Sequence, residues 1–185
     1  MSQAARPPGL IIEGIMTTLA PGNGAPETRV NIAPMGPIVD QAWTTFIFRP
    51  FKTSNTYRNL KAHGQGVFHV IDDVLLIARA AVSSVLPGDE IPTQPTTQIT
   101  GLVLAQACRY HELVVTQLDD AQDRTTIVMK SMHRETLREF TGFNRAKHAV
   151  LEAAILATRL HLTGHETVLA EYAKLQVLEI GRAHV

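Results

Sequence analysis

Short apolar runs separated by turn-forming residues fill the first three quarters of the chain, and runs of this length are typical of β-strands. Residues 10–19 and 29–40 are two such runs, on either side of the Gly- and Pro-rich segment 21–26. They predict an antiparallel hairpin with a rather long loop. Residues 44–48 and 66–71 predict a third and a fourth strand.

A helix is predicted between the third and fourth strands. It covers residues 55–62, and Gly64 ends it, because glycine readily adopts the backbone conformation that closes a helix. After the fourth strand the pattern is ambiguous, and residues 74–82 fit either a short helix or a short strand. Residues 83–97 contain prolines at 87, 92 and 95 and predict a loop long enough to act as a functional lid.

A second hairpin is predicted from residues 101–118 and 125–139, which flank the polar stretch 119–124. The strand that follows this stretch alternates well between apolar and polar residues. The hairpin therefore adds two further strands to the four predicted before it.

From Asn144 onward the apolar residues recur at spacings of three and four, which predicts a helix that Gly164 ends. A second helix is predicted at residues 166–179, with its apolar residues on one side. The two form a helical hairpin whose small-residue face suits close contact with another helix, in the same subunit or a second one. The expected packing positions are Ala146, Val150, Ala153, Ala154, Ala157 and Leu160 in the first helix, and Val168, Leu169, Tyr172, Leu175 and Leu178 in the second.

Together these elements predict an α+β protein. A barrel of about six strands with one internal helix is expected at residues 10–140, followed by a helical region at residues 141–185. Residues 1–9 have no apolar core of a signal peptide, and we expect them to form a flexible tail.

The composition narrows the functional class. The chain has 185 residues, 45% of them hydrophobic, which is enough to bury one sizeable core. Lys and Arg number 17, as do Asp and Glu, so no overall positive field attracts a nucleic acid and any anion site is local. The single Cys108 excludes an internal disulfide, and no apolar run approaches the roughly 18 residues of a membrane span. We therefore predict a cytoplasmic protein without a nucleic-acid or membrane partner.

The segment RPFKTSNTYRNL, residues 49–60, is the strongest candidate for a binding site. It places cations and hydroxyls around the first turn of the predicted helix, where N–H groups lack intrahelical partners and the helix dipole is positive. Such an arrangement favours a phosphate, because charge-assisted hydrogen bonds are the stronger kind. The alternative is that Ser54 only caps the helix and that the cations are solvated.

The segment NIAPMGP, residues 31–37, is unusual inside a strand. Pro34 and Pro37 cannot donate ladder hydrogen bonds, so the strand is expected to have an exposed or interrupted edge. Ala33 and Gly36 would leave room for a flat ligand against the backbone. The alternative is a bulged edge strand without a ligand.

Other candidate constellations are weaker. The chain has eight histidines but no HExxH sequence, and Cys108 with His111 supplies only two ligands, so no metal site is predicted. His69 is expected to be a half-buried strand histidine rather than a catalyst, and Cys108 a buried small residue. Asp72 and Asp73 could suggest a pair of catalytic carboxylates, but neighbours on a strand point to opposite faces and cannot both contact one substrate. They are expected instead to begin the next segment.

Five segments are spread over residues 10–162: IIEGIMTTL, NIAPMGPIVD, RPFKTSNTYRNL, GVFHVIDDVLLIARAA and NRAKHAVLEAAILATRL. They resemble the DUF447 family of flavin-binding split-barrel proteins. The resemblance implies a split antiparallel β-barrel related to flavin reductases and pyridoxamine-phosphate oxidases, with a C-terminal helical hairpin. It also implies a homodimer that binds FMN near the subunit interface.

The resemblance implies the cofactor contacts as well. The isoalloxazine ring is expected against Asn31, Ala33, Pro34 and Met35. The FMN phosphate is expected among Arg49, Lys52, Thr53, Ser54, Thr56 and Asn59. The second group coincides with the anion site inferred independently from the residues, and this agreement favours phosphate binding.

If FMN binds, it supplies the redox chemistry, and the protein needs no catalytic acid or base of its own. The expected activity is a flavin-dependent oxidation or reduction of a small molecule. The chain has no GxGxxG sequence, so NAD(P)H is expected only as a transient electron donor on the flavin face. The family's link to organisms that use tetrahydromethanopterin makes a pterin a candidate substrate.

Two alternatives remain open at this stage, because one pocket serves several functions and a fold does not define a function. The first is a flavin carrier, sensor or assembly protein that holds FMN without turnover. The second is a barrel without a ligand whose dimer interface is its purpose.

Overall fold

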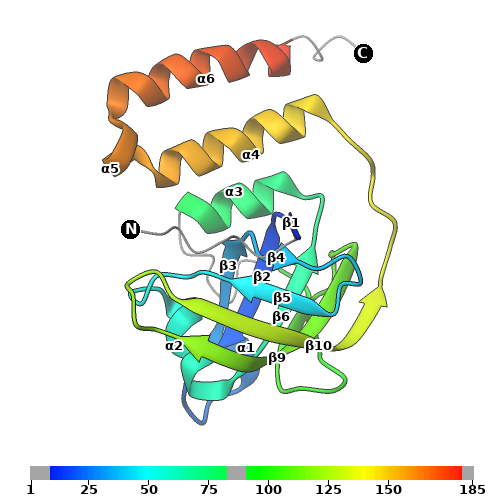
Figure 1. Cartoon of the computed structure of the whole chain (residues 1–185). Helices are drawn as coiled ribbons and strands as arrows, with labels where there is room; N and C mark the ends of the chain where they lie inside the picture. Colours follow the sequence, from blue (N-terminus) through cyan, green and yellow to red (C-terminus); the bar gives the residue numbers. More distant parts are fainter. Residues whose placement is uncertain (1–8, 83–90, 181–185) are drawn as a thin grey trace.

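The computed structural model describes residues 9–82 and 91–180 of the chain. The predicted tail at residues 1–9 lies outside the described residues except for Gly9, and so do residues 83–90 of the predicted lid loop. Figure 1 shows the arrangement of the described helices and strands.

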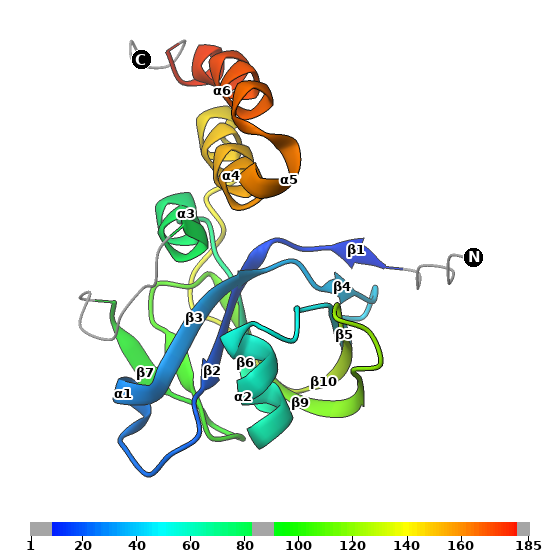
Figure 2. The same ribbon diagram turned by 90° about the vertical axis from the view of Figure 1, so that its left-hand side faces the viewer.

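An eight-stranded antiparallel sheet curls into an open barrel at the centre of the molecule (Figure 2). In spatial order its strands are β1 (Leu10–Ile11), β4 (Ile38–Val39), β5 (Thr45–Phe48), β10 (Thr126–Thr136), β9 (Arg109–Asp119), β6 (Gln65–Val70), β2 (Gly14–Leu19) and β3 (Val30–Met35). A separate two-stranded sheet pairs β7 (Thr93–Pro95) with β8 (Leu102–Leu104). The predicted fold class, an α+β protein with a split antiparallel barrel, is confirmed, with more strands than predicted.

The first predicted hairpin is the pair β2–β3. Its loop contains a single helical turn, α1 (Pro26–Arg29), which begins at a proline as helices often do. The outer ends of the predicted strands form the separate strands β1 and β4, which pair with each other. Strand β3 is the last strand of the sheet, so the exposed edge expected from its prolines is confirmed.

The second predicted hairpin is the pair β9–β10, with register shifts between Val128 and Met129 and between Ser131 and His133. Its first strand begins at Arg109, later than predicted, because residues 102–104 belong to β8. Strand β8 pairs with residues 93–95, so the end of the predicted lid loop is a strand rather than a loop. A three-residue apolar run cannot show from sequence alone which strand it will pair with.

Apolar clusters pack against both faces of the sheet. Ile15 and Met16 are neighbours in β2 and belong to different clusters, because successive strand residues point to opposite faces. The Met16 cluster fills the barrel with Phe46, Phe48 and Phe68. Tyr57 and Leu60 of the helix α2 (Asn55–His63) complete this cluster. The cluster on the other face of the sheet is covered by Leu76 and Ile77 of the helix α3 (Val74–Val82).

The helix α2 begins where its sequence predicts and ends one residue later, at His63. Ser54 caps its start, and Gly64 ends it in the left-handed conformation, with a φ of 66°. The ambiguous segment that follows β6 is the helix α3. It lies between strand β3 and the helix at residues 145–158, and contact on two sides explains why its pattern is nearly continuous in apolar residues.

The C-terminal helices form a stack outside the barrel, with α4 (Arg145–Thr158) on α3 and α6 (His165–Ile180) on α4 (Figures 1 and 2). The predicted helical hairpin is thus confirmed. Asn144 caps α4 by accepting hydrogen bonds from the N–H groups of Ala146 and Lys147. The predicted first helix is interrupted at Arg159, and its last turn is a separate helix, α5 (Leu160–Thr163).

Small residues allow α4 to pack closely. Ala149 and Ala154 are buried, and the hydroxyl of Tyr172 in α6 donates a hydrogen bond to the carbonyl of Ala153 at 2.9 Å. Leu169, which was expected to face the partner helix, is instead exposed. None of the helices at residues 9–82 and 91–180 is long and apolar enough to cross a membrane.

Candidate functional site

The start of α2 is the place where the sequence predicts an anion site. The hydroxyl of Ser54 accepts a hydrogen bond from the N–H of Tyr57 at 3.2 Å and donates one to the carbonyl of Phe51 at 2.8 Å. Ser54 therefore caps the helix, as the simpler interpretation expected. The N–H groups of Asn55 and Thr56, in the first turn, have no intrahelical acceptor and can bind an anion.

Two of the predicted cations flank this helix start. Arg49 follows the end of β5 and is exposed, and Lys52 is half-buried. In the part of the chain that the structure describes, neither side chain makes a hydrogen bond or an ion pair. Arg58, by contrast, donates to the carbonyl of Thr53 at 3.0 Å and to the side chain of Asn55 at 2.8 Å. Arg49 and Lys52 are thus the cations that can bind a ligand without losing an internal partner.

A polar network joins the start of α2 to the edge strand β3. The side-chain amide of Asn31 donates to the hydroxyl of Thr56 at 3.2 Å, and Asn59 donates to the hydroxyl of Thr18 at 3.0 Å. Thr18, Thr56 and Asn59 are buried. The network brings together the two halves of the predicted FMN site, the strand assigned to the ring and the helix assigned to the phosphate. Thr18 was not predicted as part of it.

The other predicted ring contacts lie along β3. Ala33, Pro34 and Met35 are half-buried. Asn31, Ala33 and Met35 share one face of the strand, and Pro34 lies on the other. The space above Gly36 is not free, because a methyl group there would lie 2.8 Å from the carboxylate of Glu13. Because this carboxylate ends a flexible side chain, the expectation that Gly36 leaves room for a flat ligand stays a prediction.

A second polar cluster near α2 was not predicted. Asp120 accepts hydrogen bonds from the hydroxyl of Tyr57 and the ammonium of Lys61, both at 2.7 Å. Both hydrogen bonds lower the pKa of Asp120, and the one from Lys61 has the larger effect. The pair Tyr57 and Lys61 has the spacing of one helical turn, but no sequence signal points to an aspartate this far along the chain.

The histidine and cysteine candidates have structural surroundings. His69 is completely buried rather than half-buried, and its ring bonds to the carbonyl of Ile15 and the N–H of Leu104. Cys108 is buried, which confirms its expected role as a small core residue. Within the described ranges, no group of three or more His, Cys, Asp or Glu side chains could hold a metal ion.

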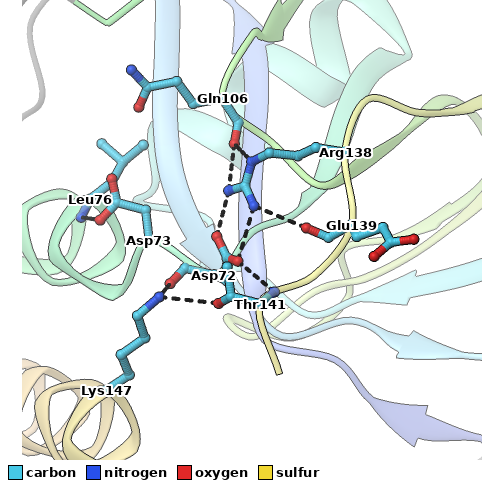
Figure 3. Close-up of polar contacts among 8 residues, drawn as sticks. All are labelled: Asp72, Asp73, Leu76, Gln106, Arg138, Glu139, Thr141 and Lys147. Carbon is cyan, nitrogen blue, oxygen red and sulfur yellow. Dashed lines mark hydrogen bonds and ion pairs between the residues drawn. The ribbon is translucent and has the colours of Figure 1, made fainter. Parts of the chain in front are cut away.

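A buried carboxylate joins the barrel to the C-terminal helices (Figure 3). Both oxygens of Asp72 accept hydrogen bonds from Arg138, which hold the pKa of Asp72 well below its usual range. One oxygen also accepts from the N–H of Thr141 at 2.9 Å, and Lys147 of α4 donates to the Asp72 carbonyl at 2.9 Å. We call residues 137–144, between β10 and α4, the strap. Asp73 caps α3 through the N–H of Leu76, so the two aspartates begin this segment as expected.

The fold and the candidate site define a class: a split-barrel protein with a basic helix start beside an exposed edge strand. The chain belongs to the family described as protein of unknown function DUF447. The model of the family's N-terminal domain matches residues 13–138, and a second DUF447 model matches residues 144–178. A search of curated proteins finds no match to the chain.

Solved structures share the fold. An FMN-bound DUF447 protein from Methanosarcina mazei is 24% identical, with a TM-score of 0.76 over 94% of this chain and 87% of that one. An FMN-binding protein from Thermus thermophilus is 14% identical, with a TM-score of 0.57 over 74% of this chain and 79% of that one. The flavin reductase HpaC in complex with NADP+ is 14% identical, with a TM-score of 0.58 over 72% and 82% of the two chains.

Proposed function

We propose that the chain binds FMN between β3 and the start of α2 and acts as a flavin-dependent oxidoreductase on a small molecule. The observation that carries the proposal is the hydrogen bond from Asn31 to Thr56. It places the strand expected to contact the ring beside the helix expected to bind the phosphate. The FMN-bound relative from M. mazei and the FMN-binding protein from T. thermophilus support the same cofactor.

The residues at the start of α2 fit a phosphate. Arg49 and Lys52 supply positive charge that no carboxylate neutralises through an ion pair in the described structure. The N–H groups of the first helical turn and the hydroxyl of Thr53 add uncharged donors. Ser54 contributes by fixing the start of the helix. The side chains of Thr56 and Asn59 are already hydrogen-bonded to Asn31 and Thr18, so these two residues contribute by holding α2 against β3 and β2.

The bound flavin would supply the electron transfer, and the chain's residues bind and orient it. Asn31, Ala33 and Met35 present one face of an edge strand, so a ring can approach the backbone without displacing a neighbouring strand. NAD(P)H is the electron donor that we propose, bound transiently, and the flavin reductase in complex with NADP+ supports this choice. A pterin is the first substrate class to test.

We further propose that the protein is a cytoplasmic homodimer. Large apolar side chains are exposed on the strap and the C-terminal helices, among them Phe143, Leu162, Leu169 and Val177. A second copy that covers them would lower the exposed apolar area, as dimer interfaces do.

A comparison of FMN with riboflavin tests the phosphate site. The double variant Arg49→Gln/Lys52→Gln should bind FMN about tenfold to a hundredfold more weakly, because it loses charge-assisted hydrogen bonds. Its affinity for riboflavin, which lacks the phosphate, should not change. Both affinities are measured by calorimetry or by flavin fluorescence, with circular dichroism to check the fold.

A matched control removes two positive charges elsewhere. Lys130→Gln/Arg145→Gln has the same change in net charge, on exposed residues of β10 and α4, and should bind FMN like the parent protein. Equal loss in both double variants, or an unchanged FMN affinity in the first, would contradict the phosphate site.

Anaerobic addition of NADH or NADPH to the FMN-loaded protein tests the oxidoreductase activity: bleaching of the flavin absorbance supports it. A retained flavin that neither nicotinamide bleaches favours a carrier.

A further inference from the structure

A cavity of about 850 Å³ lies outside the proposed FMN site, between the barrel, the strap and α4. None of the residues assigned to FMN lines it. Its volume is in the range of small-molecule sites, which are mostly apolar with a few polar groups. Much of its wall is aliphatic and comes from Ile11, Ile12, Val70, Ile71 and Leu151.

One unpaired cation lines this cavity. The Nε atom of Arg109 is buried and has no hydrogen-bond partner in the described part of the chain. The Arg109 side chain also forms no ion pair with a carboxylate at residues 9–82 and 91–180. Burial and the charge of the nearby Arg134 both lower its pKa. Arg109 as a whole is half-buried, and its buried Nε without a hydrogen-bond partner is unfavourable; a bound anion would relieve this cost.

The guanidinium is held in place by the chain's single tryptophan. The central carbon of Arg109 lies 4.2 Å from the ring centroid of Trp43, a cation–π contact. Trp43 has a φ of 57°, which is rare for a residue other than glycine and marks a position fixed by its surroundings. Its ring stacks on His111 at 5.4 Å, and its backbone N–H donates to the carbonyl of Asp40. Arg109 is therefore ordered before a ligand binds.

The carboxylates that line the cavity do not neutralise Arg109. Asp72 is bound by Arg138 and the strap. Glu13 has a raised pKa, caused by burial and then by repulsion from Glu152, and Arg159 is the cation that interacts with it. Lys147 also lines the cavity, but it donates hydrogen bonds to the carbonyl of Asp72 and the hydroxyl of Thr141. Arg109 is thus the Lys or Arg side chain of the described lining that has no hydrogen-bond partner.

We propose that this cavity binds a small aromatic carboxylate, with its anion on Arg109 and its ring against the aliphatic wall. A carboxylate matches the planar fork of a guanidinium, and a flat apolar body suits the aliphatic side chains around it. The proposal does not depend on FMN, because no residue of the FMN site takes part.

The single tryptophan gives a direct test. The ¹⁵N-labelled protein has one indole N–H cross-peak, which belongs to Trp43 beside the proposed ligand. Titration with 2-naphthoate should shift this peak, and calorimetry should give binding about tenfold tighter than for 2-naphthamide, its neutral analogue of similar shape. Equal affinities for the two compounds, or no binding of 2-naphthoate, would overturn the proposal without any variant.

Variants locate the anion on Arg109. Arg109→Gln should reduce the affinity for 2-naphthoate to that for 2-naphthamide, whereas Arg109→Lys should retain part of the difference. Arg124→Gln is the matched control, because Arg124 also lies over an aromatic ring, that of Phe51, but outside the cavity. A preference for the carboxylate that survives in a folded Arg109→Gln protein would place the anion elsewhere and contradict the proposal.

Discussion

At the scale of single residues, His69 shows how a polar side chain can be built into the core. Its Nε2 accepts a hydrogen bond from the N–H of Leu104 in β8, so Nδ1 carries the proton and donates to the carbonyl of Ile15 in β2. The ring is neutral and joins three strands. The sequence indicated a strand histidine, but its complete burial depends on partners 35 and 54 residues away.

Buried neutral histidines make the stability depend on pH. Burial lowers the pKa of His69 and of His111 to about 4, from 6.5. Between these values the unfolded chain binds more protons than the folded one, so the free energy of unfolding falls as the pH decreases from about 6.5 to about 4. Each histidine contributes on the order of 3 kcal/mol to this loss. Urea unfolding at several pH values measures it.

A control separates His69 from the other titrating groups. Gln can donate and accept hydrogen bonds but does not titrate, so His69→Gln should show a shallower dependence on pH over the same range. The same slope in both proteins would show that His69 does not cause the dependence.

At the scale of elements, the strap is fixed by one buried carboxylate. Asp72 binds Arg138 at the start of the strap, Thr141 within it, and Lys147 of α4 through its carbonyl (Figure 3). The sequence predicted that Asp72 and Asp73 begin α3. It did not indicate that one of them anchors the C-terminal helices, because Arg138 lies 66 residues further along the chain.

Removing the charge of Asp72 should loosen this anchor. Asp72→Asn leaves Arg138 without a carboxylate and should destabilise the protein by about 1–3 kcal/mol. Hydrogen exchange should increase in the strap and α4 more than in the barrel strands. Asp73→Asn is the matched control, since asparagine caps helices as well as aspartate does and α3 should be unaffected. Equal exchange in the two variants would contradict the anchoring role.

At the scale of the whole molecule, the helical stack covers one side of the barrel, and α2 lies away from it (Figure 1). The proposed phosphate site at α2 therefore lies away from the cavity at α4, whereas the ring positions of β3 end beside Gly36, next to Glu13 of the cavity wall. The C-terminal helices also shield α3, whose partner α4 contributes Leu151 to the cluster beneath it.

A truncated chain tests how far the barrel depends on these helices. Deletion of residues 144–185 should expose the apolar surface of α3 and cause aggregation, because a large exposed apolar patch favours association. Size-exclusion chromatography with light scattering measures the outcome against the full-length chain. A truncated protein that stays monodisperse and binds FMN would show that the helices are dispensable.

The sequence by itself determined the features that depend on near neighbours. Ser54, Gly64 and Asn144 mark helix ends because each bonds to backbone groups within a few residues, and such signals can be seen in the sequence. The prolines of β3 likewise indicated an edge strand, since proline cannot donate to a neighbouring strand. The cations near α2 were found because they are close in sequence to the helix start.

Only the tertiary structure decided which distant residues meet. The sheet order places β3 at an edge with α2 packed beside it, and this lets Asn31 reach Thr56. The barrel's curvature likewise brings Trp43 to Arg109, and the return of the chain brings Arg138 to Asp72. Neither pair is marked by a local sequence pattern, because each of these residues alone is compatible with many different surroundings. The pairing of strands and the packing of helices determine which residues become neighbours, and the cavity is formed by the same packing.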